Sequence, residues 1–88
     1  MLIIKQRKRF LKDLKISEKR NKDISKLVEV MVILANYQKL PPQYKDHQLK
    51  GCYIGCRECH IENDWLLIYT INNNQIIFER TGTHSDLF

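Results

Sequence analysis

The segment from Arg80 to Phe88, with the sequence RTGTHSDLF, is rich in side chains that can do chemistry. It offers a guanidinium, an imidazole, a carboxylate and hydroxyl groups, and it carries an aromatic ring at residue 88. Arg57, His60 and Asp64 repeat these functional groups, and His47 adds a third imidazole upstream. A polar terminus is usually a solvated one, which is the alternative interpretation. Two such segments together predict an active site that cuts RNA.

RNA carries its own nucleophile, the 2′-hydroxyl beside the scissile phosphate. An enzyme must take a proton from this hydroxyl, give one to the leaving 5′-oxygen and stabilise the charge of the phosphorane. Histidine suits the proton transfers because both of its forms are populated near neutral pH. Arg57 or Arg80 can bind phosphate oxygens through paired donors. We predict no metal and no cofactor, since the sequence lacks the clustered carboxylates of a two-magnesium nuclease.

The composition narrows the class of protein. The chain has 88 residues, of which 43% are hydrophobic and 28% are charged, as in a globular domain with one modest core. Its apolar runs are far shorter than the ~20 residues of a membrane span, and its start lacks a signal-peptide pattern. We therefore expect a cytoplasmic protein with no membrane partner.

The net charge of +5 is unevenly distributed along the chain. Residues 1–50 hold 13 Lys/Arg and 5 Asp/Glu, a balance of +8, whereas residues 51–88 hold 2 and 5, a balance of −3. A basic half of this size attracts nucleic acid, an acidic membrane or an acidic protein, although an ordinary solvated helix surface is an equally good explanation.

The apolar pattern changes from helical to strand-like near Pro41-Pro42. Two helices precede the prolines, the first carrying Phe10, Leu11 and Leu14. In the second, apolar residues recur at helical spacing in Ile24, Leu27, Val28, Met31 and Ala35. Asp23 is the expected N-cap, and the prolines should end this helix by Leu40. Met1 to Ile4 is a candidate for a short leading strand.

Strands are predicted after the prolines. Gly51 to Arg57 is a weak strand candidate, and the continuously apolar Trp65 to Ile71 should be a central strand covered on both faces. Asn72 to Asn74 forms a turn, and Gln75 to Arg80 alternates Ile76 and Phe78 with more exposed positions. The order predicts an α+β domain with helices on one face of a small antiparallel sheet.

The second half of the chain resembles the YafQ branch of the RelE/ParE toxins, which belong to bacterial type II toxin–antitoxin pairs. The resemblance rests on Asp46-His47, Gly51, Arg57-Glu58-Cys59-His60-Ile61, Asp64-Trp65-Leu66-Leu67-Ile68-Tyr69 and Arg80 to Phe88. The first half matches only in its basic helical character. The resemblance implies one RelE-like domain over residues 1–88, with a short N-terminal strand and two or three helices on a small antiparallel sheet.

The resemblance also implies an activity, partners and roles. It implies an endoribonuclease that cleaves mRNA in association with the ribosome and is neutralised by a cognate antitoxin. His84 becomes the first choice for the general acid, Asp64 or His47 for the general base, and His60 for stabilising the phosphorane or orienting a neighbour. The residues implied to bind substrate are Arg57, Trp65, Arg80 and Phe88, although a tryptophan that opens an apolar strand is ordinarily a core residue.

Two other interpretations remain. A ParE-like toxin would share the fold and inhibit a protein such as gyrase without cutting RNA, but it does not need three histidines and an aspartate around one strand edge. A metal-containing nucleic-acid-binding domain would use the four possible zinc ligands Cys52, Cys56, Cys59 and His60. Strand alternation would turn Cys59 away from the other three, so buried reduced thiols are favoured over zinc.

Overall fold

The computed structural model describes residues 1–88. Along the chain the elements are β1 (Ile3–Gln6), α1 (Lys8–Lys19), α2 (Ile24–Ala35), η1 (Pro42–Tyr44), β2 (His47–Gln48), η2 (Gly51–Tyr53), β3 (Arg57–Glu62), β4 (Trp65–Asn72), β5 (Gln75–Gly82) and α3 (His84–Leu87). The two η elements are single 3₁₀ turns. No helix is long and apolar enough to cross a membrane.

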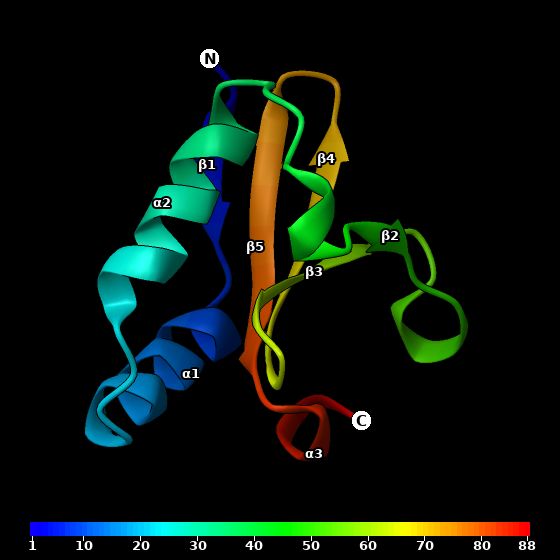
Figure 1. Cartoon of the computed structure of the whole chain (residues 1–88). Coiled ribbons are helices and arrows are strands. Elements are labelled where there is room, and N and C mark those ends of the chain that lie inside the picture. Colours follow the sequence, from blue (N-terminus) through cyan, green and yellow to red (C-terminus); the bar gives the residue numbers. More distant parts are fainter.

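The five strands form one sheet in the order β1-β5-β4-β3-β2 (Figure 1). All neighbouring pairs are antiparallel except β1 and β5, which run parallel. The predicted α+β architecture, with a short first strand and helices on a small sheet, is confirmed. The sheet is mixed rather than wholly antiparallel, because the helical crossover that follows β1 lets β5 lie beside it in the same direction.

β4 is the central strand and is buried on both faces, as predicted. On one face its odd-numbered residues Trp65, Leu67 and Tyr69 join the main core with Phe10 of α1 and Leu27 of α2. On the other face Leu66 and Ile68 pack against Leu87 of α3, and Tyr53 of η2 adds to that cover. The helices α1 and α2 therefore lie on one face, and α3 with the η2 segment covers the other.

The second helix ends before Leu40, as predicted, but differs from its prediction on its buried face. Asp23 is the N-cap, as predicted, and accepts the Ser25 N–H at 3.1 Å. The helix ends at Ala35, five residues before Leu40, and Tyr37 follows with a left-handed φ of 62°. Val28 was predicted to face the core, but it is 49% exposed, and Val30 is buried instead.

The predicted strand from Gly51 to Arg57 is wrong. Gly51–Tyr53 forms a 3₁₀ turn, and the strand begins only at Arg57. Gly51 and Gly55 have φ values of 68° and 89°, which a strand does not allow and which glycine adopts easily. The segment is therefore a compact loop, and it packs over the second face of the sheet.

The β4–β5 hairpin matches its prediction. Asn73 turns the chain with a φ of 45°, a conformation that asparagine tolerates well. Ile76 and Phe78 of β5 are fully buried, as their alternation predicted. A register shift between Ile68 and Tyr69 interrupts the pairing of β4 with β5.

Candidate active site

Three imidazoles gather on the second face of the sheet, at its β2–β3 side. His47 of β2 pairs with Glu58 of β3, and His60 lies two residues further along β3 on the same face. The ring centroids of His47 and His60 are 6.3 Å apart, and those of His60 and His84 are 5.8 Å apart. His60 therefore lies between the other two, and the structure brings all three predicted histidines together.

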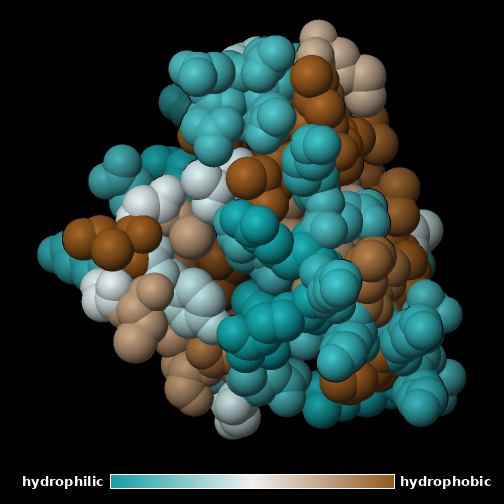
Figure 2. Space-filling model, turned by 180° about the vertical axis from the view of Figure 1, so that it is seen from behind, coloured by the Kyte–Doolittle hydropathy of each residue, from teal (hydrophilic) through white to brown (hydrophobic).

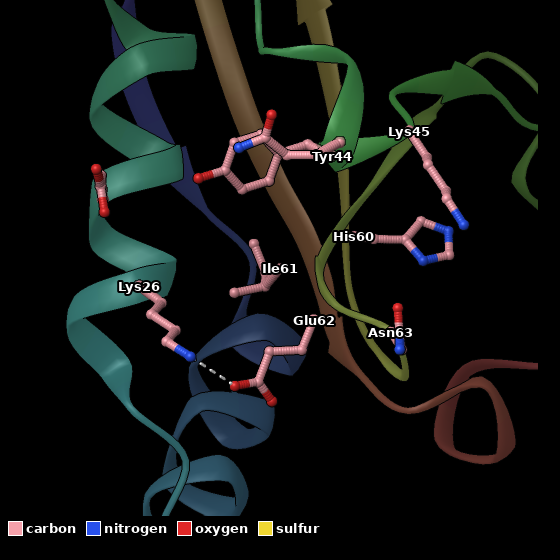
Figure 3. Close-up of a pocket in the computed structure, with 9 residues that line it drawn as sticks. Lys26, Tyr44, Lys45, His60, Ile61, Glu62 and Asn63 are labelled. Carbon is pink, nitrogen blue, oxygen red and sulfur yellow. Dashed lines mark hydrogen bonds and ion pairs between the residues drawn. The ribbon is translucent and has the colours of Figure 1, made fainter.

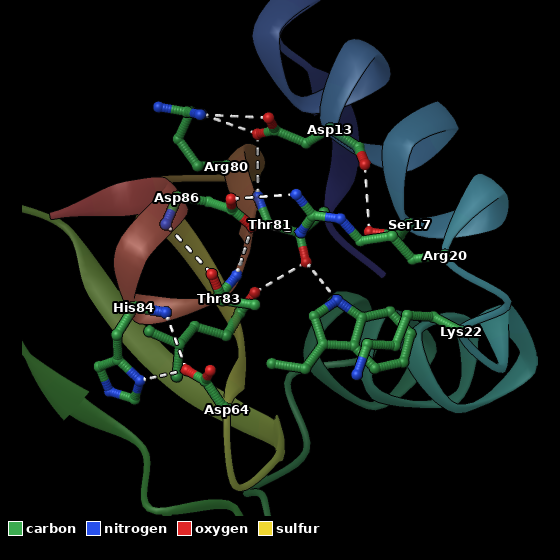
Figure 4. A network of polar contacts seen from close by, with 12 residues as sticks. Asp13, Ser17, Arg20, Lys22, Asp64, Arg80, Thr81, Thr83, His84 and Asp86 are labelled. Atoms are coloured by element: carbon green, nitrogen blue, oxygen red, sulfur yellow. Dashed lines mark hydrogen bonds and ion pairs between the residues drawn. The ribbon is translucent and has the colours of Figure 1, made fainter.

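Asp64 holds His84 in a defined orientation. The Asp64 Oδ1 atom accepts the His84 backbone N–H at 2.9 Å and lies 2.6 Å from His84 Nδ1 (Figure 4). These two hydrogen bonds, the backbone one first, lower the pKa of Asp64, so this carboxyl group stays ionised. Because Nδ1 donates its hydrogen bond to the ionised Asp64, His84 Nε2 is left to exchange a proton with a substrate. The geometry favours Asp64 as the partner that orients His84 rather than as the general base.

The short helix α3, which carries His84, is attached to the rest of the molecule by its cap. Thr83 and Asp86 form a capping box, in which each side chain accepts the backbone N–H of the other. Asp86 also pairs with Arg20 at the end of α1 at 2.7 Å, and this guanidinium is the main reason that the pKa of Asp86 is lowered. A Cβ on Gly82 would lie 2.9 Å from Asp86 Oδ2, so the close approach requires glycine.

The loop that presents His47 is fixed by the residue before it. The Asp46 carboxylate accepts hydrogen bonds from Tyr69 at 2.7 Å and from Arg57 at 3.2 Å. Lys45 has a left-handed φ of 50°, and its carbonyl oxygen lies 2.6 Å from His47 Nδ1. The Lys45 carbonyl thus holds the His47 ring, and Asp46 anchors the loop before it.

Three of the four predicted substrate-binding residues do not join the histidines. Trp65 is buried in the core and donates its indole N–H to Thr81 at 3.0 Å. Arg57 binds Asp46 on the opposite face of β3, and Arg80 is engaged by Asp13 of α1 at 2.7 Å. The side chains of Trp65, Arg57 and Arg80 therefore stabilise the structure around the site. Their positions in the sequence did not indicate their partners in the fold.

Phe88 differs from these three because it is 63% exposed and directly follows α3, the helix that begins at His84. It packs edge-to-face against Tyr53, with ring centroids 5.4 Å apart. The Tyr53 hydroxyl donates to the Leu87 carbonyl at 3.1 Å, which holds the end of α3 in place. An exposed, oriented ring of this kind can stack on a nucleobase.

Deletion of Phe88 is expected to weaken RNA binding by ~1–3 kcal/mol, the usual contribution of one base–aromatic stack. Equilibrium binding of an uncleavable oligonucleotide with a 2′-deoxy cleavage position measures this loss. Phe88→Trp is the matched control, since it keeps a stacking ring and should retain affinity. Equal affinity of the deletion and the parent chain would remove Phe88 from the RNA site.

Sequence reasoning missed Glu58, which lies among the histidines. Its Oε2 atom is 3.1 Å from His47 Nε2 and 3.8 Å from His60 Nε2. The residue is 5% exposed, and its Oε1 atom is buried without a hydrogen-bond partner. A sequence signal existed, because a residue two positions before His60 on a strand shares its face.

A pocket of about 380 Å³ lies between α2, η1 and β3 (Figure 3). Lys26 and Glu62 form an ion pair on one side of it, and His60 lies across the β3 ribbon from that pair. His60 is the only one of the three histidines that lines this pocket. The side chains of His47 and His84 are about half exposed, whereas that of His60 is largely buried.

The cysteines and His60 do not form a metal site in this structure. No group of three or more histidine, cysteine or acidic side chains is arranged to hold a metal ion. Cys59 is buried in the main core, and this burial raises the pKa of its thiol, which stays protonated. Cys56 packs on the other face, near Thr70, and Cys52 is exposed.

The fold and the sequence together define a toxin of the bacterial type II toxin–antitoxin systems. The family model of the YafQ toxins of this class matches residues 2–88. The chain belongs to the YafQ family, and the resemblance seen in its sequence is confirmed.

Named relatives and solved structures of similar proteins support the assignment to this family. The chain is 48% identical over 80 residues to the mRNA interferase toxin YafQ of Escherichia coli strain K12, covering 90% of this chain and 87% of that protein. It superposes on YafQ in the E. coli DinJ–YafQ complex with a TM-score of 0.92 and 44% identity, covering 100% and 99% of the two chains. A metal-bound toxin from Helicobacter pylori gives a TM-score of 0.93 at 47% identity, with both chains fully covered.

Proposed function

We propose that this chain is an mRNA interferase, an endoribonuclease that cleaves mRNA by acid–base catalysis with the RNA 2′-hydroxyl as nucleophile. The observation that carries the proposal is the His84–Asp64 pair, joined at 2.6 Å through Nδ1, with two further imidazoles beside it. Membership of the YafQ family and the mRNA interferase named among its relatives support the same activity.

Each of the three histidines has its own role in the proposed reaction. His84, oriented by Asp64, donates a proton from Nε2 to the leaving 5′-oxygen. His47 or His60 removes the proton of the 2′-hydroxyl, and the other one stabilises the negative charge of the phosphorane. Attack by the 2′-hydroxyl leaves a 2′,3′-cyclic phosphate on one fragment and a 5′-hydroxyl on the other. None of these steps needs a cofactor.

The surroundings of the site suit a polyanionic substrate. Arg7, Lys8 and Arg9 line a hollow of about 540 Å³ whose wall also contains Tyr53, the residue against which Phe88 packs. Seen from behind, a broad hydrophilic band covers the middle of the molecule, with apolar patches toward its margins (Figure 2). RNA that stacks on Phe88 can therefore continue toward this basic segment.

Membership of the family supports three partners for this chain. We infer that a cognate antitoxin neutralises the chain, as the DinJ–YafQ complex of the E. coli relative suggests. We also infer that mRNA is cut on the ribosome, which places the toxin in the cytoplasm. Acidic side chains on the antitoxin would compete with RNA for the basic segment.

Mapping RNA 5′ ends after brief induction tests the proposed function. The parent chain should create new 5′-hydroxyl ends within coding sequences, and the His84→Ala variant at equal protein level should not. Growth arrest by the parent chain without any new RNA ends would refute the proposal and favour a protein target.

RNA binding is expected to weaken steeply with salt through the basic segment. Each neutralised single-strand phosphate contributes a log–log slope of about −0.7. Replacing Lys5, Arg7, Lys8 and Arg9 with glutamine should therefore flatten the slope measured by RNA-binding titrations. Lys19→Gln, at the other end of α1, is the control and should change the slope less. An unchanged slope in the quadruple variant would exclude this segment from the RNA site.

Excess EDTA is expected to leave the cleavage of naked RNA unchanged, because side chains carry the proton transfers. Ribosome-free substrate is essential, since ribosomes themselves require magnesium. The measurement is informative because a similar toxin from H. pylori has a structure with bound metal. Activity that is lost on chelation and restored by zinc alone would overturn the mechanism and favour a metal site.

A further inference from the structure

Lys45 adopts a backbone conformation that its residue type disfavours. It closes the 3₁₀ turn η1, where its backbone N–H donates to the Pro42 carbonyl at 3.0 Å, and its φ of 50° lies in the left-handed region. A residue with a Cβ is strained in this region, whereas glycine is not. Strained conformations of this kind cluster at functional sites.

The turn needs the backbone of Lys45 but not its side chain. The carbonyl oxygen of this residue lies 2.6 Å from His47 Nδ1, and glycine at position 45 would present the same oxygen. Of the other three non-glycine residues with a positive φ, two are asparagines, which tolerate the conformation. The third, Tyr37, uses its side chain in the fold, because its hydroxyl donates to the Asn73 carbonyl at 2.7 Å. The Lys45 side chain has no such structural use.

The ammonium group of Lys45 is an unpaired charge beside the histidines. Lys45 is exposed and forms no ion pair, whereas Lys26 pairs with Glu62 at 3.1 Å. Lys45 and His60 line the same pocket, and the Lys45 side chain extends toward the His60 ring in Figure 3. Glu29 of α2 also lines this pocket, but no ion pair joins it to Lys45. The charge is therefore available to a ligand that reaches His60.

Lys45 lies at the end of the histidine cluster opposite to Phe88. His60 is between His47 and His84, and the carbonyl of Lys45 contacts the His47 ring. Phe88 follows α3, the helix that begins at His84. An RNA strand that crosses the three imidazoles from Phe88 therefore continues toward Lys45. A lysine ammonium suits a phosphate there, since it is a compact charge with three donors on a flexible stem.

We propose that Lys45 is a substrate-binding residue, whose ammonium group binds the RNA phosphate next to the scissile one on the side away from Phe88. This role rests on the proposed function and adds a phosphate contact that the basic segment at the start of α1 does not supply. The contact is made equally before and during the reaction. Its loss therefore raises KM and leaves kcat unchanged.

Neutralising single phosphates of the RNA tests the contact directly. The probe is an RNA oligonucleotide with a 2′-deoxy cleavage position, in which an uncharged methylphosphonate replaces one phosphate at a time. Lys45→Gln should weaken binding of the unmodified probe by about tenfold, as expected for one charge-assisted hydrogen bond. The methylphosphonate next to the cleavage position should cost the parent chain a similar factor. The two changes together should cost no more than either alone, because both remove the same contact.

The salt dependence and the kinetics give two further measurements. Lys45→Gln should make the log–log salt dependence of binding shallower by about 0.7, the contribution of one single-strand phosphate. With a cleavable oligonucleotide, KM should rise by about the same factor as the dissociation constant, and kcat should stay unchanged.

Three variants separate the charge of Lys45 from its turn. Lys45→Arg keeps a cation and should retain RNA affinity. Lys45→Gly removes the charge and suits the left-handed φ, so it should unfold at the same temperature as the parent or higher, yet bind RNA as weakly as Lys45→Gln. Lys15→Gln is the matched control, since Lys15 is an exposed lysine of α1 that does not line the pocket. It should affect all the methylphosphonate probes alike.

Two results would overturn the inference. Equal affinity of the parent and Lys45→Gln for the unmodified probe would remove Lys45 from the RNA site, and cleavage by the same parent would leave the proposed function standing. A lower unfolding temperature of Lys45→Gly would show that the side chain stabilises the free protein instead. Conversely, a parent chain that binds the probe through Lys45 but does not cleave RNA would refute the proposed function and support the phosphate contact.

Discussion

Replacement of His84 by alanine is expected to lower the rate of RNA cleavage by ~10²–10⁴-fold, the contribution typical of one acid–base group. The loss should appear in kcat, while affinity for RNA stays nearly unchanged, because Phe88 and the basic segment remain. The fold should persist, since the His84 side chain is half exposed and contributes nothing to the core. Single-turnover cleavage of a defined oligonucleotide measures the effect.

Ser85→Ala is the matched control for His84→Ala. Ser85 is the next residue of α3, is exposed and makes no side-chain hydrogen bond, so its loss should leave the rate within a factor of a few. A stronger test removes residues 84–88. If that folded protein still cut RNA and still arrested growth, the active site would lie elsewhere.

Replacement of Asp13 by alanine is expected to destabilise the fold by about 3 kcal/mol, the lower end for breaking a buried ion pair. Asp13 accepts hydrogen bonds from Arg80 at 2.7 and 3.1 Å and from the Thr81 backbone N–H at 3.2 Å (Figure 4). Hydrogen bonding to Asp13 raises the pKa of Arg80, whose side chain is 13% exposed. When the Asp13 carboxylate is removed, Arg80 therefore stays charged and is left without its partner.

Thermal denaturation should show the midpoint falling by about 12–24 °C, given ~4–8 °C per kcal/mol in a domain of this size. Glu18→Ala, an exposed acidic position on the same helix, is the control and should change the midpoint little. The double variant Asp13→Leu/Arg80→Met should recover much of the stability, because it leaves no buried charge unpaired. A single variant as stable as the parent would show that the pair contributes nothing to the fold.

The sequence predicted the parts that depend on local pattern. The N-cap at Asp23, the doubly buried strand from Trp65 and the turn at Asn73 each follow from residue type and periodicity, and each is confirmed. The toxin family was also recognisable from the motifs between Asp46 and Phe88, and it is confirmed.

The sequence did not show which partners these residues have in the fold. Arg80 was predicted to bind phosphate, and the structure adds a carboxylate partner 67 residues away on α1. Trp65 was assigned to the substrate, but β4 alternation places it with Leu67 and Tyr69 in the core. The loop at Gly51 was predicted as a weak strand, because residue type does not show that Gly51 and Gly55 adopt a positive φ.

The position of β5 between β1 and β4 determines when the toxin can become active during its own synthesis. Ile3 has no strand partner until Gln75 has been made, so the sheet cannot close on a shorter nascent chain. Pairing over such a separation is slow compared with the local hairpin of β4 and β5. His84 follows β5, and its partner Asp64 precedes β4. A ribosome that is still translating residues 75–84 therefore carries an incomplete sheet, and the chain gains His84, the proposed proton donor, only after β5 has been synthesised.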